Sequence, residues 1–396
     1  MKNDIFINGY ALDCALGASP EEVSRQLFSE NPEVSVRKHE IFKMPFFTMA
    51  EYDKKEYIHF RSFLHCFNAV RSALKMAFPR TGVPPGTLRV GCVAGTTGDV
   101  QFGDLDFYKA LKEQKVTDDR IYHFVHGTIA ERIVQGYCFS GPAITISNTC
   151  VSGADAVLVG AQYLEADICD VVIVLGIDLI SLMCLTGFYT LGAASEKRCT
   201  PFDTNRSGMN VGEGCGCVIL RKGSLDEKYE KTFSKPEFRF SGGGSAGDAY
   251  HLTAPHPEGK GLRLAIEKAF AMSGKRAEDI AFINAHGTGT PANDASETNA
   301  INAIFGKNVP FFSTKGLTGH TLGASGILEL IFTMLCLKEQ KIPASYGCTE
   351  PAGDLPAVPN MQLRSITGNT AMSTSLAFGG CNTALIVERI EENALD

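Results

Sequence analysis

The sequence predicts an α/β protein, on three observations. Short apolar segments of strand length alternate with longer helix-like segments in both halves of the 396-residue chain. Residues 170–178 (DVVIVLGID) form a continuous apolar segment, which is typical of a strand in a parallel sheet covered on both faces. The 40 glycines include few linker-like runs, which indicates many tight turns between strands and helices.

In the first half, the best-defined helix is expected at residues 58–77, where apolar residues recur with a helical period until Pro79 ends the pattern. A buried strand at 88–97 should run into a glycine turn. The other elements predicted in this half are helical segments with loops over 107–139, a strand at 143–147, a helix after Cys150, and strands at 170–178 and 215–222.

The second half repeats this alternation. Its predicted elements are a helix at 259–273, a strand at 280–285, a helix at 294–304, a strand at 309–314, a helix at 322–338 and a closing hairpin-like pair at 370–378 and 383–390. Residues 221–237 are the most polar stretch, so we expect one half over 1–232 and another over 233–396. Two similar halves indicate an internal duplication, although no residue-by-residue repeat is recognisable.

Composition narrows the function classes. The net charge is −7, from 37 Lys and Arg against 44 Asp and Glu, which does not favour a nucleic-acid or anionic-membrane partner. No run of 18 apolar residues occurs, and Asp4 interrupts any N-terminal signal sequence. The 13 cysteines form no C-x-x-C pair, which suits small buried thiols in a reducing compartment. We therefore expect a cytoplasmic protein.

Four segments carry reactive groups, in the order GPAITISNTCVSG, INAHGTGTPANDASE, STKGLTGHTLGASGILE and STSLAFGGCN. They supply the thiol of Cys150, the imidazoles of His286 and His320, the ammonium of Lys315 and a glycine-rich loop. Carbon–carbon bond formation on thioesters needs such a set. A thiolate holds an acyl group, neutral imidazoles donate hydrogen bonds to a developing enolate, and backbone amides bind an oxyanion.

Cys150 follows a predicted strand and precedes a predicted helix. The positive end of that helix dipole would favour the thiolate, and Gly153 would let the helix pack closely on the sheet. For any one of the 13 cysteines a buried structural thiol is the commoner outcome. The flanking T-C-x-S-G and the three downstream segments favour a nucleophile at this position.

His286 and His320 each follow an apolar strand, where α/β proteins place ligands. Thr288 and Thr290 add hydroxyls two residues apart, which suit an extended polar ligand arm. Two alternatives stay open. The histidines could simply hold loops in the core, or form a His–His–Cys zinc site, which the wide spacing of the three residues makes less favourable.

Lys315 lies five residues before His320, and a buried lysine needs carboxylate partners. Three acids are candidates: Glu329, Asp294 and Glu297. Such a network would orient the imidazoles and set their tautomers. Ordinary surface pairing is the alternative for any one of these acids.

The segment Ala-Phe-Gly-Gly at 377–380 joins the last two predicted strands. Backbone amides in such a turn, around Phe378 and Gly379, can form half of an oxyanion hole. A Gly-Gly loop by itself is most often a plain turn.

The four segments in this order resemble the elongating β-ketoacyl-acyl-carrier-protein synthases of the thiolase superfamily. The similarity runs over nearly the whole chain, and H-G-T-G-T-P-x-N-D-x-x-E and T-K-G-x-T-G-H-T-x-G-A-x-G are its most specific motifs. It implies a five-layered α-β-α-β-α fold of two duplicated halves, usually in a homodimer. It also implies an acyltransferase that uses no metal or nucleotide, with substrates carried on the phosphopantetheine of acyl carrier protein.

The resemblance implies a role for each matching residue. Cys150 would carry the acyl chain as a thioester, while His286 and His320 would promote decarboxylation of malonyl carrier and stabilise the enolate. Lys315 and Glu329 would be their electrostatic partners. The amides of Cys150 and Phe378 would form the oxyanion hole, and Phe378 and Gly379 would gate the acyl pocket. Thr288 and Thr290 would bind phosphopantetheine.

The chain departs from the family pattern near the expected acyl pocket. The differences are Thr149 where Ala is common, Met209-Asn210 in place of Phe-Val, Leu376-Ala377 in place of Phe-Gly, and a somewhat short segment between Phe188 and Pro201. We therefore predict retained catalytic machinery with a reshaped pocket. Such a pocket favours a specialised pathway, such as a type II polyketide or polyene, over bulk fatty-acid elongation.

Three function classes stay open, with a condensing synthase favoured. A non-catalytic subunit that shapes the pocket of a partner synthase would not need an intact Cys150. A degradative thiolase using coenzyme A would carry a second catalytic cysteine; Cys381 lies in the right region but in different motifs. Initiating synthases carry His and Asn instead of two His.

Two kinds of protein partner are expected. An acidic carrier protein would dock on a local basic patch, for which the candidate residues are Lys54, Lys55, Arg61 and Arg120. The dimer partner would be either a second copy of the chain or a different ketosynthase-like chain.

Overall fold

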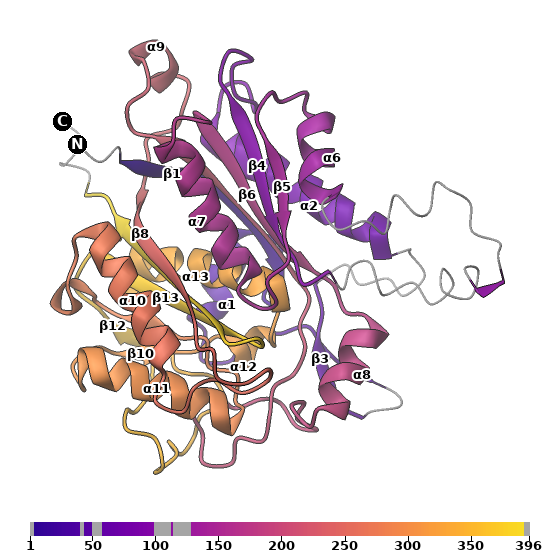
Figure 1. The fold of residues 1–396 in the computed structure, drawn as a ribbon, viewed down its shortest axis with the longest axis vertical. Helices are drawn as coiled ribbons and strands as arrows, with labels where there is room; N and C mark the ends of the chain where they lie inside the picture. The colour runs from indigo at the N-terminus through magenta and orange to yellow at the C-terminus, as the bar shows by residue number, and fades with distance from the viewer. Residues whose placement is uncertain (1–3, 40–42, 50–57, 99–111, 114–127, 392–396) are drawn as a thin grey trace.

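The computed structural model describes residues 4–39, 43–49, 58–98, 112–113 and 128–391 (Figure 1). The predicted helix at 58–77 is α2 (Ile58–Ala77), with the predicted bounds. The predicted helical region at 107–139 falls partly outside the described residues. Within them it is represented by α6 (Thr128–Gly136).

The first half of the chain supplies half of the main sheet. Its strands in this sheet are β1 (Ile5–Cys14), β4 (Val90–Gly95), β5 (Ala143–Ile146), β6 (Val171–Asp178) and β7 (Gly214–Lys222). Strands β2 (Val36–Lys38) and β3 (Pro45–Phe47) form a separate ribbon. The remaining described helices are α1 (Pro20–Leu27), α7 (Ser152–Glu165), α8 (Leu182–Thr190) and α9 (Glu227–Glu230).

The second half supplies the rest of the main sheet. Its strands there are β8 (Phe238–Gly247), β9 (Ile283–Asn284), β10 (Phe311–Phe312), β13 (Thr370–Ala377) and β14 (Cys381–Arg389). Its helices are α10 (Lys260–Ser273), α11 (Pro291–Phe305), α12 (Lys315–Thr318) and α13 (Ser325–Glu339), and β11 (Lys341–Ile342) pairs with β12 (Arg364–Ser365). Helix α11 begins earlier than predicted because Pro291 occupies its first turn, where proline is favoured.

The main sheet has the same strand order in both halves. The described strands run β10-β9-β13-β14-β8-β1-β7-β6-β4-β5. Numbered in chain order within each half, both sets read 3-2-4-5-1 from their outer edge. The halves join where β1 pairs with β8 over Ile5–Ile7. The expected duplication is therefore confirmed as repeated topology.

The core is divided into three layers by the two halves of the sheet. Along β6, Ile173 packs in a core with α2 and α6, whereas Val174 faces a central core that contains α7 and α13. Along β14, Leu385 faces the same central core, and Ile386 faces a third core with α10 and α11. Helices α2 and α6 thus cover the sheet half of the first part of the chain, and α10 and α11 cover that of the second part (Figure 1). Helices α7 and α13 lie between the two sheet halves. The predicted five-layered α-β-α-β-α arrangement is confirmed.

The sheet is mixed, which corrects one expectation. Strand β6 pairs parallel with β4 but antiparallel with β7, and β13 and β14 form an antiparallel hairpin. The continuous apolar segment at 170–178 predicted a parallel sheet. Such a segment indicates only that a strand is buried on both faces. Every residue of β6 is buried, although one neighbouring strand is parallel to it and the other antiparallel.

Strand β8 was not predicted, because its sequence FRFSGGGSAG contains four glycines, which weaken the usual strand signal. The structure explains one of them. A Cβ atom added at Gly244 would lie 2.3 Å from the Ala265 carbonyl oxygen of α10, so only glycine allows this close approach.

Gly153 has a different role from the predicted one. A Cβ atom at Gly153 would lie 2.6 Å from the carbonyl oxygen of Gly323, which precedes α13. The missing side chain of Gly153 therefore allows α7 to pack close to the start of α13. The close contact between α7 and the sheet occurs at Gly160, where an added Cβ would lie 2.9 Å from Val174. Among the described helices, none is long and apolar enough to span a membrane.

Candidate active site

Three of the predicted reactive residues, Cys150, His286 and His320, line one cavity of about 320 Å³. Cys150 reaches it from the turn between β5 and α7, and it is almost completely buried. His286 follows β9, and His320 follows α12, the short helix after β10. Because β5 and β10 occupy equivalent positions in the two halves, the duplicated topology itself brings Cys150 and His320 to the same place.

The two histidines form a close pair. Their ring centroids are 4.9 Å apart and the rings are nearly perpendicular, at 82°. Both side chains are buried, and both line the cavity that contains Cys150. The alternative of two histidines that merely hold separate loops does not explain this shared position.

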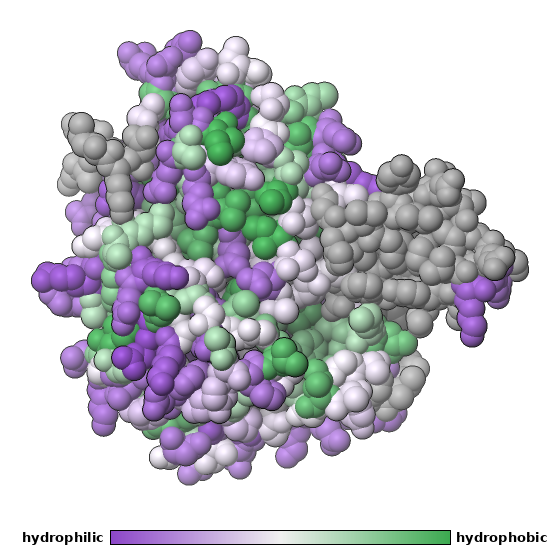
Figure 2. Space-filling view, in the orientation of Figure 1, coloured by the Kyte–Doolittle hydropathy of each residue, from purple (hydrophilic) through white to green (hydrophobic). Residues whose placement is uncertain are grey.

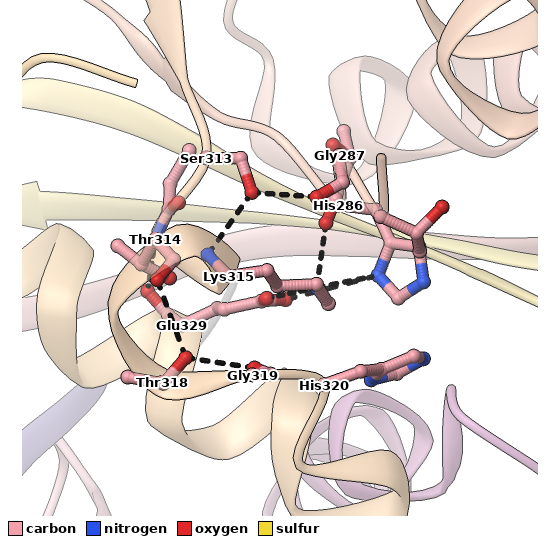
Figure 3. A network of polar contacts seen from close by, with 12 residues as sticks. His286, Gly287, Ser313, Thr314, Lys315, Thr318, Gly319, His320 and Glu329 are labelled. Carbon is pink, nitrogen blue, oxygen red and sulfur yellow. Dashed lines mark hydrogen bonds and ion pairs between the residues drawn. The ribbon is translucent and has the colours of Figure 1, made fainter. Parts of the chain in front are cut away.

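Lys315 links His286 to Glu329 (Figure 3). Its Nζ donates to the His286 carbonyl oxygen at 2.6 Å, contacts His286 Nδ1 at 3.1 Å and donates to Glu329 Oε1. An ammonium has no acceptor, so Nδ1 of His286 must accept and its proton must lie on Nε2. The predicted pairing of Lys315 with Glu329 is thus observed.

A backbone amide gives His320 the same tautomer. The N–H of Leu322 donates to His320 Nδ1 at 3.2 Å, which again leaves the ring proton on Nε2. The hydrogen-bond network therefore assigns both imidazoles as Nε2 donors. This is the protonation state that enolate stabilisation requires.

Burial keeps both imidazoles neutral. It lowers the pKa of His286 well below its usual range, and the nearby Lys315 ammonium lowers it further. Burial, the Lys315 ammonium and the neighbouring His286 lower the pKa of His320 well below its usual range. Burial also raises the pKa of Glu329, against the opposing effect of Lys315.

Asp294 and Glu297 do not pair with Lys315, which corrects a second expectation. Glu297 accepts the amides of His286 and Gly287, each at 2.7 Å. Asp294 Oδ1 accepts the amide of Thr288 at 3.1 Å. Both acids lie on α11 and hold the H-G-T-G loop from behind. Burial raises the pKa of Asp294 to about 6 and that of Glu297 to about 7. Backbone amides oppose both shifts, those of Phe202 and Gly289 at Asp294 and those of Gly287 and His286 at Glu297.

Two threonines and Phe378 of the glycine loop also line the cavity. Thr288 and Thr290 line it, with their hydroxyl oxygens 2.8 Å apart. Phe378 also lines it, and its ring centroid lies 5.8 Å from that of Phe188 on α8. Sequence analysis did not predict α8 or this ring contact, because an apolar nine-residue helix without a polar face has no helical period.

Gly379 is not available as an oxyanion donor. Its amide donates to the Leu252 carbonyl oxygen at 2.7 Å, so of the two loop residues only Phe378 stays a candidate for that role. Gly379 has φ +86° and Gly380 has φ +75°, a backbone that glycine adopts without strain.

Comparison with known proteins agrees with this geometry. Residues 65–225 match the family model of the β-ketoacyl synthase N-terminal domain, and residues 239–349 match that of the C-terminal domain. The chain belongs to the β-ketoacyl synthase family.

Several members illustrate the relationship. The chain is 36% identical over 262 residues to 3-oxoacyl-[acyl-carrier-protein] synthase 2 of Staphylococcus aureus (strain COL), covering 63% of this chain and 62% of that protein. The corresponding protein of Coxiella burnetii is 34% identical over 266 residues, covering 64% and 63%. The match thus spans less than two thirds of the length of these curated relatives.

Solved structures match over the whole chain. One chain in the structure of a Xenorhabdus doucetiae ketosynthase in complex with its chain length factor is 28% identical, with a TM-score of 0.83 and 98% of each chain covered. A β-ketoacyl synthase from Burkholderia phymatum is 25% identical, with a TM-score of 0.86, over 99% of this chain and 100% of that one. The fold is therefore the thiolase-like fold of ketosynthases.

Some of the residues that depart from the family pattern line the cavity, and another holds a loop beside it. Met209, Leu376 and Ala377 line the cavity, as predicted for a reshaped pocket. Asn210 instead holds a neighbouring loop, because its side chain accepts the Cys199 amide at 2.7 Å and donates to the Ser195 carbonyl oxygen at 3.0 Å.

Arg61 is not a docking residue for a carrier protein. It is 4% exposed, and both of its terminal nitrogens lie 3.4 Å from the buried carboxylate of Glu213. The other proposed docking residues lie outside the described residues; they are Lys54, Lys55 and Arg120.

Cys381 does not line the cavity. Its thiol donates to Asn148 Oδ1 at 3.3 Å, and burial raises its pKa. The thiolase alternative needs a second catalytic thiol at the site, and Cys381 does not provide one. Across the described part of the chain, no three His, Cys, Asp or Glu side chains gather so that they could hold a metal ion.

Replacing Lys315 by Met is expected to lower the free energy of unfolding by about 3–5 kcal/mol, because it leaves the buried Glu329 carboxylate without its partner. Denaturant unfolding measures this change. The double variant Lys315→Met, Glu329→Leu should recover most of the loss. Lys231→Met, which removes an exposed ion pair with Glu227, should have little effect. A loss in the double variant as large as in the single one would contradict the pairing.

The neutral imidazoles also predict a pH dependence of stability. In the unfolded chain His320 takes up a proton as the pH falls through about 6.5. In the folded chain its pKa is well below that value, so acidification stabilises the unfolded state more than the folded one. Between pH 7.5 and 5.5 the wild-type chain should lose about 1.4 kcal/mol more than His320→Asn, which lacks that proton site. Denaturant unfolding at both pH values measures the difference, and equal losses in both proteins would contradict the lowered pKa.

Proposed function

We propose that this chain is a 3-oxoacyl-[acyl-carrier-protein] synthase, an acyltransferase that catalyses a decarboxylative Claisen condensation. One observation carries the proposal: the Cys150 thiol and two neutral histidines of the Nε2–H tautomer line the same cavity. Each curated relative described above is named as such a synthase, which supports the same reaction.

The first half-reaction loads the acyl chain. The thiolate of Cys150 attacks the carbonyl carbon of an acyl thioester, a new C–S bond forms, and the bond to the phosphopantetheine sulfur breaks. The proton from the Cys150 thiol leaves with the released carrier thiol. The amides of Cys150 and Phe378 would stabilise the oxyanion formed during this transfer.

The second half-reaction forms the carbon–carbon bond. The malonyl carboxylate leaves as CO₂, and its electron pair passes into an enolate whose oxygen accepts hydrogen bonds from the Nε2–H groups of His286 and His320. The enolate carbon attacks the Cys150 thioester, and the thiolate leaves to restore the enzyme. Lys315 and Glu329 act as positioning residues, because they fix the tautomer of His286.

The carrier arm and the acyl pocket occupy different parts of the cavity in this proposal. Thr288 and Thr290 would bind the phosphopantetheine arm at the mouth. Met209 and Leu376 line the cavity where this chain departs from the family pattern, so the acyl chain would be one from a specialised type II polyketide or polyene pathway. The reaction as written needs no metal or nucleotide.

We further propose that the chain works as a dimer, with a second copy or with a ketosynthase-like partner. Among the described strands, β5 lies at an outer edge of the main sheet, and its Ile144 is exposed. Figure 2 shows hydrophobic residues on the surface around α8, where Met183 and Leu191 are exposed. An open sheet edge and exposed apolar side chains are typical of a surface that a partner covers.

Two assignments complete the proposal. The halves would divide at residues 232 and 233, between the end of β7 and the start of β8, and the two family domains match on either side of this point. All 13 cysteines are free thiols in the structure, and the reaction requires one of them reduced, so the cytoplasm is the proposed location.

Acyl loading tests the proposed function. The purified chain is incubated with saturated, unsaturated and aryl-primed acyl carriers, and its intact mass is recorded. A stable adduct is expected, mapped to Cys150 by peptide mass analysis, with a preference for unsaturated or aryl donors. Broad preference for ordinary saturated chains would contradict the specialised pathway. Absence of any adduct would contradict catalysis by this chain alone and favour a non-catalytic, pocket-shaping subunit of a heterodimer.

A further inference from the structure

Thr149, directly before the proposed nucleophile, has an unusual backbone conformation. Its φ is +48°, in the left-handed region, where β-branched residues rarely occur because of steric strain. Such strain persists only where surrounding contacts hold it, and it is most common at functional sites. Its side chain provides one such contact.

The Thr149 hydroxyl binds the glycine loop. Its Oγ1 donates to the Phe378 carbonyl oxygen at 2.9 Å, a contact between residues 229 positions apart in the sequence. The same peptide unit is held on its other side, where the Gly379 amide donates to the Leu252 carbonyl oxygen at 2.7 Å. The 378–379 peptide is therefore bound at both its C=O and its N–H.

Two glycines lie beside this peptide, and the Phe378 ring lines the cavity. The two left-handed glycines Gly379 and Gly380 follow this peptide, and a Cβ added at Gly379 would meet no other atom within 4 Å. The Phe378 ring lies against Phe188 and lines the cavity. A shift of the peptide would therefore move the ring that borders the path to Cys150.

We propose that Thr149 is a positioning residue that latches the 377–380 loop closed over Cys150. The hydroxyl holds the Phe378 carbonyl, which keeps the Phe378 ring across the cavity and its amide beside the nucleophile. The latch belongs to this chain in particular, because the residue before the cysteine is commonly Ala in the family it resembles. The proposal rests on the proposed function only for the acyl substrate; the latch itself is a property of the loop.

Size-dependent alkylation of Cys150 tests the latch without any acyl donor. Wild type and Thr149→Val are treated with iodoacetamide and with a bulky pyrene maleimide, and the modification rate at Cys150 is followed by peptide mass analysis. Loss of one hydrogen bond should raise the bulky rate about two- to tenfold, while the iodoacetamide rate stays nearly constant. An unchanged ratio of the two rates, or an equal rise in both, would overturn the latch.

Three variants separate latching from general damage. Thr149→Ser keeps the hydroxyl and should restore the wild-type ratio. Thr149→Gly removes the hydroxyl but fits the positive φ, so it should raise the ratio even if Thr149→Val folds poorly. In a Phe378→Ala background, where the ring is already gone, Thr149→Val should add no further increase. Thr232→Val, which removes a hydroxyl bonded to the Tyr229 carbonyl oxygen outside the cavity, is the matched control.

The two proposals can fail separately. If no acyl carrier loads Cys150 but the alkylation ratio responds to Thr149, the latch stands and the proposed reaction falls. If acyl loading occurs while the alkylation ratio is the same in wild type and Thr149→Val, the reaction stands and the latch falls.

Discussion

Replacing Cys150 by Ala is expected to abolish acyl transfer to the chain. The methyl group of alanine has no nucleophile, and no other thiol lines the cavity among the described residues, so no covalent acyl-enzyme can form there. Intact mass measured after incubation with the best acyl donor should show the full adduct on wild type and none on the variant. The chemical step should fall to the background of the assay.

Two other cysteine variants serve as controls for this prediction. Cys381→Ala changes the partly buried thiol that donates to Asn148, and Cys138→Ala changes an exposed one. Both variants should load like wild type, because neither thiol lines the cavity. An adduct that persists in Cys150→Ala, or that disappears in Cys381→Ala, would refute the assignment of the nucleophile.

Replacing either histidine by Ala should separate the two half-reactions. His286→Ala and His320→Ala keep the thiol, so the acyl adduct should still form at Cys150. Each variant loses one Nε2–H donor to the enolate, and removal of a single donor of this kind typically slows the chemical step about 10²- to 10³-fold. The measurement is the rate of CO₂ release from malonyl carrier by chain that has first been loaded and freed of excess donor.

The loading assay on each histidine variant is its own control for folding and access. A variant that neither loads nor condenses would point to a damaged site and not to a lost donor. If CO₂ release by both variants equalled that of wild type, the histidines would have no part in decarboxylation. Equal effects of the two replacements are not required, because only His286 contacts Lys315 directly.

The reactive residues were predictable because the signals are local. Cys150 precedes a helix, His286 follows a strand, and His320 follows the short helix α12, so each residue lies at the end of an element that its own neighbours specify. The alternation of strand and helix was predictable for the same reason, as the bounds of α2 illustrate. Strand β8 was not predictable in this way. Its glycines are required by the close packing of α10 against the strand, and their own neighbours in the chain give no sign of that contact.

The partners of the reactive residues were harder to predict. Sequence spacing alone left Glu329, Asp294 and Glu297 as candidates for Lys315, and only the family resemblance favoured Glu329, which is the one of the three that contacts it. The other two lie on α11 behind the H-G-T-G loop, where backbone amides compete for their oxygens. Which acid meets which donor depends on how the helices pack on the sheet, and sequence spacing carries no information about that.

By itself, the sequence determined the type and order of most of the elements, the duplicated halves, and the thiol, imidazoles and ammonium of the site, because backbone preference and motif spacing act over short distances. The tertiary structure alone decided the mixed direction of the sheet, the Nε2–H tautomer of His286, the burial of Arg61 and the bond from Thr149 to the loop at 377–380. Each of these depends on groups that are far apart in the chain and meet only in the folded protein.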